Sequence, residues 1–70
     1  MIRNKIQKLI EEQKITNLEV FELSSELTNI PKKSVSSKEW FDLKEKVLLL
    51  EQEYSLRNVF ISELQTLLVE

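Results

Sequence analysis

The sequence predicts an all-α protein: an antiparallel two-helix hairpin of coiled-coil type, with residues 1–70 as a single domain. Three observations predict this fold. Apolar residues recur at alternating steps of three and four, which places one stripe along one side of each helix. The 70 residues include no glycine and one proline, so little interrupts helical structure. The proline lies near mid-chain, where a short turn folds the second helix back on the first.

Each half of the chain carries one stripe with a polar interruption. The stripe in the first half consists of Ile2, Ile6, Leu9, Gln13, Thr16, Val20, Leu23, Leu27 and Ile30. The stripe in the second half consists of Trp40, Leu43, Val47, Leu50, Tyr54, Arg57, Ile61, Leu64 and Leu68. Each stripe requires a partner helix to cover it.

The polar interruptions of the two stripes are expected to meet. With the turn centred between residues 33 and 34, Gln13 and Thr16 lie opposite Tyr54 and roughly Glu51, and Arg57 lies one turn away, opposite residues 9–10. Polar groups at one level of a helix pair can fix its register and its partner. The alternative interpretation is that weakly packed regions simply tolerate polar residues.

Local signals predict a helix over residues 2–30, a loop over 31–36 and a helix over 37–69. Pro31 ends the first helix because the residue before a proline is pushed out of helical geometry. Ser36, followed three residues later by Glu39, forms a capping box at the start of the second helix.

The weakest part of the first helix is the segment 14–17. Ile15, Thr16 and Asn17 are mediocre helix formers, and Thr16 with Glu19 could form another capping box. Three helices over 2–13, 17–29 and 37–69 are therefore an alternative. The continuous helix is favoured because the stripe crosses this segment without a change of phase.

The second helix carries more large apolar side chains than one stripe needs. We expect these residues to form a protein interface: Phe41, Leu48, Leu49, Leu56, Phe60 and Leu67. A two-helix hairpin has no interior left to bury them, and exposed apolar patches usually mark contact surfaces. The hairpin is therefore expected to assemble into a helical bundle, either with itself as a homodimer or tetramer or with another protein.

Composition narrows the possible functions. The chain has no Cys and no His, and the formal net charge is -2. We therefore expect no catalytic residues, no cofactor and no metal site, and nucleic acid is an unlikely partner because binding to its backbone needs a positive face. No apolar run is long enough to span a membrane, which favours the cytoplasm. The predicted function is that of a small non-enzymatic regulator, adaptor, inhibitor or chaperone-like protein that binds another protein.

Residues 2–30 resemble the small aspartyl-phosphate phosphatases that act on the sporulation phosphorelay regulator. Those proteins are short helical hairpins with a Ser-Gln-Glu-Leu-Asp signature, and this chain has Ser24, Ser25, Glu26, Leu27 and Thr28 at the five positions. The resemblance implies activity on a phosphorylated response regulator. Because Thr28 replaces the acidic residue, and a hydroxyl cannot act as an ionised carboxylate, a degenerate phosphatase is implied.

The apolar residues around the proline also resemble those of helix-turn-helix repressors. Leu23, Leu27, Ile30 and Val35 fall near the apolar positions of such a motif, and residues 31–34 lie where a recognition helix would begin. A small DNA-binding regulator is therefore a further alternative, although the turn lacks the glycine or small residue that this motif uses. A hairpin loop with solvated lysines explains the same residues.

Overall fold

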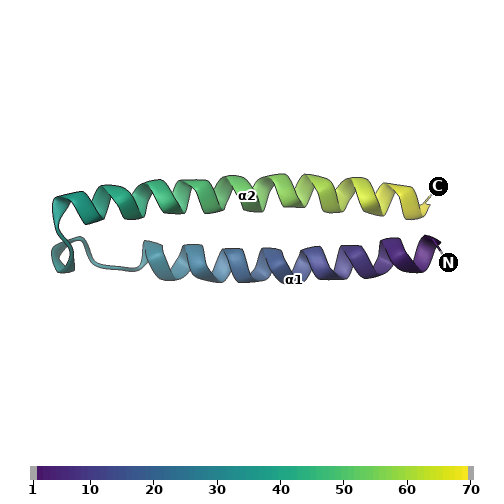
Figure 1. Ribbon diagram of the computed structural model, residues 1–70, viewed down its shortest axis with the longest axis horizontal. Helices are drawn as coiled ribbons and strands as arrows, with labels where there is room; N and C mark the ends of the chain where they lie inside the picture. Colours follow the sequence, from purple (N-terminus) through teal and green to yellow (C-terminus); the bar gives the residue numbers. More distant parts are fainter. Residues whose placement is uncertain (1, 70) are drawn as a thin grey trace.

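The computed structural model describes residues 2–69, and it is an antiparallel helical hairpin (Figure 1). Helix α1 spans Ile2–Thr28, a short 3-10 helix η1 spans Lys32–Ser34, and helix α2 spans Ser37–Val69. The two long helices lie side by side, so the first and last described turns are at the same end of a rod of 52 × 14 × 12 Å. The all-α hairpin predicted from the sequence is confirmed.

Helix α1 is continuous through the weak segment, as the unbroken phase of the stripe favours. The Thr16 hydroxyl donates to the backbone oxygen of Glu12 at 3.0 Å. Its hydrogen bond is therefore made within α1, and Thr16 does not cap a new helix. The helix ends at Thr28, two residues before the predicted end. Pro31 explains this difference, because its ring disfavours helical geometry at Ile30.

The turn and the start of α2 agree with the predicted loop. Pro31 has φ -67° and ψ 137°, and its backbone oxygen accepts from the backbone N–H of Ser34 at 3.1 Å. The Ser36 Oγ accepts from the backbone N–H of Glu39 at 3.2 Å and donates to the Glu39 carboxylate at 3.0 Å. The Ser36 side chain therefore caps α2 as predicted, although the Glu39 carboxylate bonds the Ser36 hydroxyl and not the backbone N–H of a full capping box, and α2 begins at Ser37 as predicted.

Removing this cap should weaken the hairpin measurably. Replacing Ser36 with alanine leaves the Glu39 N–H without its acceptor, so we expect the free energy of unfolding to fall by about 1 kcal/mol. Urea denaturation followed by circular dichroism measures this change. The matched control is Ser37→Ala, one residue further on. An equal loss of stability in both variants would contradict a specific role for the Ser36 hydroxyl.

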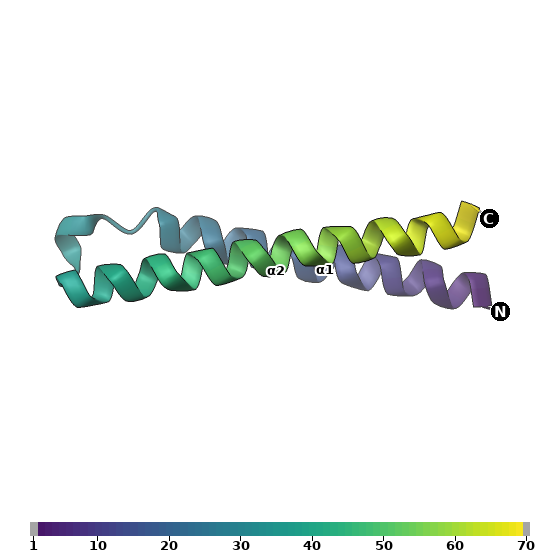
Figure 2. The same ribbon diagram turned by 90° about the horizontal axis from the view of Figure 1, so that it is seen from above.

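The buried side of α2 is the predicted stripe. All nine of its stripe residues are buried or half-buried, and every other described residue of this helix is exposed. The best-buried apolar side chains are Ile10 of α1 with Ile61 and Leu64 of α2, at 2%, 6% and 7% exposure. Ile6, Leu9 and Leu68 pack around them, so the core lies toward the end of the rod away from the turn. Figure 2 shows the two helices crossing at a shallow angle.

The buried side of α1 differs from the predicted stripe. The side chains that fit a regular pattern of alternating four- and three-residue steps along the seam, the line where the helices touch, are Ile6, Ile10, Gln13, Asn17, Val20, Ser24 and Leu27. Ile10, Asn17 and Ser24 thus take the places given to their preceding neighbours. Leu9 and Thr16 remain half-buried, but Leu23 is 42% exposed and Ile2 is 74% exposed.

Candidate functional site

The centre of the seam is polar. The Asn17 side chain, only 4% exposed, donates through Nδ2 to the Asn58 Oδ1 at 2.9 Å and to the backbone oxygen of Tyr54 at 3.2 Å. The Arg57 Nε donates to the Gln13 Oε1 at 3.0 Å, and its Nη1 donates to the Asn17 Oδ1 at 3.4 Å. These hydrogen bonds join the two helices at one level, so they fix the register.

The predicted meeting of the two polar interruptions is therefore confirmed, but its details differ. Arg57 was expected opposite residues 9–10, and it instead bonds Gln13 and Asn17. Thr16 was the expected seam residue, but its hydroxyl turns to its own helix. The signal that could have identified Asn17 is its spacing, four residues after Gln13 and three before Val20, which continues the alternating pattern.

Arg57 is the only charged residue of this network. Its Nη2 lies 3.6 Å from the Glu53 Oε1, one turn earlier in α2, and the two side chains are 18% and 48% exposed. The Arg57 charge is thus compensated within the hairpin. Because the polar groups at this level are paired with one another, the network joins the two helices.

The six predicted interface residues are all exposed, but they lie on two sides of α2. Leu49, Leu56, Phe60 and Leu67 each directly precede a seam residue, which places them together along one side of the helix. We call these four residues the lateral face. Phe41 and Leu48 each follow a seam residue, so they lie on the opposite side.

The grooves on either side of the seam contain different members of this set. One groove is lined by Gln13, Leu49, Gln52, Glu53, Leu56, Arg57 and Phe60. Leu48 lines a different groove, together with Leu27, Thr28, Trp40, Leu43, Lys44, Val47 and Glu51. The structure thus brings Leu49, Leu56 and Phe60 together in one groove, while Leu48 and Leu56 share another groove on the outer side of α2 with Glu51, Gln52 and Ser55.

The exposures of these side chains are large for apolar residues. Leu56 is 71% exposed, Phe60 41%, Leu49 59% and Leu67 55%. On the other side, Phe41 is 70% and Leu48 54% exposed. The lateral face is therefore a row of large apolar side chains left open to solvent over several turns of α2.

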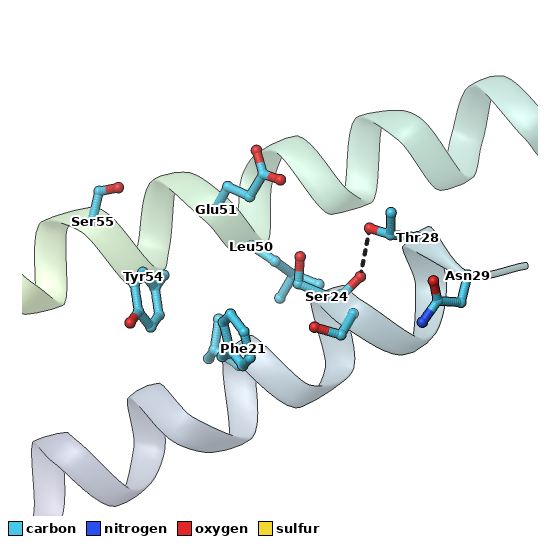
Figure 3. A pocket seen from close by; sticks show the side chains of 10 residues that line it. Phe21, Ser24, Thr28, Asn29, Leu50, Glu51, Tyr54 and Ser55 are labelled. Carbon is cyan, nitrogen blue, oxygen red and sulfur yellow. Dashed lines mark hydrogen bonds between the residues drawn. The ribbon is translucent and has the colours of Figure 1, made fainter.

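A shallow groove of about 500 Å³ lies on the opposite side of the seam (Figure 3). It contains the segment that resembles the phosphatase signature, because Ser24, Ser25 and Thr28 line it with Tyr54 of α2. The Thr28 hydroxyl donates to the backbone oxygen of Ser24 at 2.7 Å. Phe21 and Tyr54 also line the groove, as an aromatic pair with ring centroids 6.0 Å apart.

The described residues 2–69 contain no group of three acidic side chains arranged to hold a metal ion. Neither helix in this range combines the length and the apolar character that crossing a membrane would require. No known family model matches the chain, and no curated protein or solved structure shows significant similarity to it.

Proposed function

We propose that this hairpin is a small non-enzymatic protein-binding module that docks a helix of its partner on the lateral face of α2. One observation carries the proposal: four large apolar side chains, spaced to lie along one side of a rigid helix, are between 41% and 71% exposed. Burying each such side chain contributes roughly 1.5 to 3 kcal/mol relative to leaving it in water. An amphipathic helix laid along a row of this kind is a common mode of recognition.

The hairpin itself supplies a rigid support for this contact. The seam behind the lateral face is fixed by the bonds of Asn17 and Arg57, so α2 presents its outer side chains in a defined register. Binding then requires little ordering of the backbone, which lowers its entropic cost. Such a module would act by covering or stabilising a partner helix, as an adaptor, inhibitor or chaperone-like regulator does.

The test is a double substitution on the lateral face. Changing Leu56 and Phe60 to Glu should abolish association, while circular dichroism stays close to that of the unmodified chain, because both side chains point away from the seam. The matched control changes Ile15 and Leu18 to Glu, since these are also exposed, at 60% and 57%, but belong to α1 and lie away from the lateral face.

Light scattering over a wide concentration range gives the first readout of association. A mass above that of the monomer, lost in the Leu56 and Phe60 variant alone, identifies a second copy as the occupant. If the chain is a monomer, the second assay is capture of other proteins on the immobilised chain. We then expect a partner to be retained by the unmodified chain and the control variant but not by the double variant. Identical behaviour of all three proteins in both assays would refute the proposed function.

A further inference from the structure

We infer that the partner helix on the lateral face is cationic as well as amphipathic; this inference rests on the proposed function above. Charge is distributed unequally between the two sides of the seam. Residues that directly follow a seam residue lie on one side, and those that directly precede one lie on the other, because each step along a helix turns by about 100°.

The grooves establish which side is which. Phe21 and Thr28 follow seam residues of α1, and Glu51 and Ser55 follow seam residues of α2; all four line the groove of Figure 3. The preceding residues of both helices therefore share the other side, where Phe60 lies.

We call the side formed by residues that directly precede seam residues the preceding side, and the other the following side. The preceding side is strongly acidic. It carries seven carboxylates and two lysines: Glu12, Glu19, Glu26, Glu39, Asp42, Glu53 and Glu63, with Lys5 and Lys46. The formal charge of this side is thus -5, whereas the whole chain has a net charge of -2. The following side carries Glu11 and Glu51 against Lys14 and Lys44, which gives a formal charge of zero.

Glu12, Glu19, Glu53 and Glu63 lie at the level of the lateral face, whereas the other three carboxylates lie nearer the turn. Glu53 and Glu63 alternate with Leu49, Leu56 and Phe60 on α2, while the row of glutamates seven residues apart on α1 lies beside them. All seven acidic residues are exposed, and of these Glu53 alone forms an ion pair in the described part of the chain. An apolar row that contains two carboxylates and has a row of glutamates along its α1 border is complementary to a helix with an apolar stripe flanked by Lys or Arg.

The same charges disfavour a second copy of this chain as the occupant. A twofold contact through the lateral face would place the same acidic side of each molecule against the other. Like charges brought together across an interface oppose association, and desolvation increases that cost. Arg57 does not offset this effect, because Gln13, Asn17 and Glu53 already engage it.

The test uses three synthetic 18-residue peptides with a fluorescent label: a Leu/Lys helix with leucines at three- and four-residue steps, the same helix with Glu in place of Lys, and a Leu/Lys peptide of scrambled order. Fluorescence anisotropy measures their dissociation constants. We expect the amphipathic Leu/Lys peptide to bind at least tenfold more tightly than the other two. We also expect its binding to weaken as NaCl rises, because salt screens the flanking charges.

Matched charge variants assign the preference to this side of the molecule. Replacing Glu12, Glu19 and Glu63 with Gln should weaken binding of the Leu/Lys peptide about tenfold. Replacing Glu11, Glu22 and Glu45 with Gln removes the same charge elsewhere and should leave binding unchanged. Circular dichroism of both variants verifies that the hairpin is intact.

The outcomes separate this inference from the function on which it rests. Equal affinity for the Leu/Lys and Leu/Glu helices, or equal effects of the two sets of variants, would overturn the cationic partner and leave the lateral face as a docking surface. A further outcome is that no peptide binds but the chain forms an oligomer, and the double variant Leu56→Glu, Phe60→Glu dissociates it. This outcome would also overturn the cationic partner and leave the lateral face as a docking surface. If no peptide binds and that double variant changes nothing, both proposals fail.

Discussion

Replacing Ile10 with alanine is expected to lower the free energy of unfolding by about 2–4 kcal/mol, which is enough to unfold much of the hairpin at 37 °C. Ile10 is the most buried apolar residue, at 2% exposure, and it packs with Ile61 and Leu64 in the one compact core of the described chain. A two-helix domain of 70 residues buries little apolar surface, so its total stability is small. Thermal unfolding followed by circular dichroism measures the loss.

The chain offers a matched control for this substitution. Ile15→Ala makes the same chemical change in the same helix, but Ile15 is 60% exposed and contacts no core. Its effect should stay within about 0.5 kcal/mol, with a slight gain possible because alanine favours the helix. If the two variants melted at the same temperature, the packing of Ile10 against α2 would be wrong.

The buried side of α2 could be predicted from the sequence because its pattern has one solution. From Trp40 to Leu68 every third or fourth residue belongs to the stripe. Tyr54 and Arg57 are its two members with a polar group other than the Trp40 indole. Ser36 predicted the start of α2, and Pro31 predicted the end of α1 to within two residues, since each acts through its nearest neighbours in sequence.

The buried side of α1 could not be assigned fully, because its pattern has two solutions. Ile6, Gln13, Val20 and Leu27 belong to both, and the positions between them can be filled by either of two adjacent residues. Apolar content favours Leu23 over Ser24 and does not distinguish Leu9 from Ile10, but the hydrogen bonds that Asn17 makes across the seam are satisfied only in the other phase. The hydrogen-bond partners on α2 therefore determine which residues of α1 are buried, because the local apolar pattern allows both phases.

The candidate site was predictable in composition but not in arrangement. The excess of apolar residues on α2 could be counted in the sequence, and all six expected interface residues are exposed. Their division into two sides, and the acidic border that α1 adds to one of them, depend on the register of the two helices. That register is set by the polar network, whose partners lie about forty residues apart in the chain.

Removing the polar network completely should stabilise the hairpin, whereas removing Arg57 alone should destabilise it. In Arg57→Met, Gln13 loses its partner and Asn17 loses one of its bonds within a half-buried seam. We expect the free energy of unfolding to fall by about 1–2 kcal/mol, because desolvated polar groups are left unpaired. Urea denaturation provides this value.

The triple variant Gln13→Leu, Asn17→Leu and Arg57→Leu replaces all three seam groups by apolar side chains. Asn58, which then lacks its partner, is exposed and can bond water. We expect a gain of about 1–4 kcal/mol, with the melting temperature rising by about 4–8 °C per kcal/mol. Gln52→Leu, an exposed substitution of the same type, is the control and should have little effect.

The opposite signs of these two effects test what the network is for. If paired polar groups fix the register at a cost in stability, the more stable triple variant should also be less specific, and light scattering should detect a mixture of assemblies rather than one species. A triple variant that loses stability would show instead that the network is a net source of it. A more stable variant with one unchanged mass would show that the apolar stripes alone determine the pairing of α1 with α2.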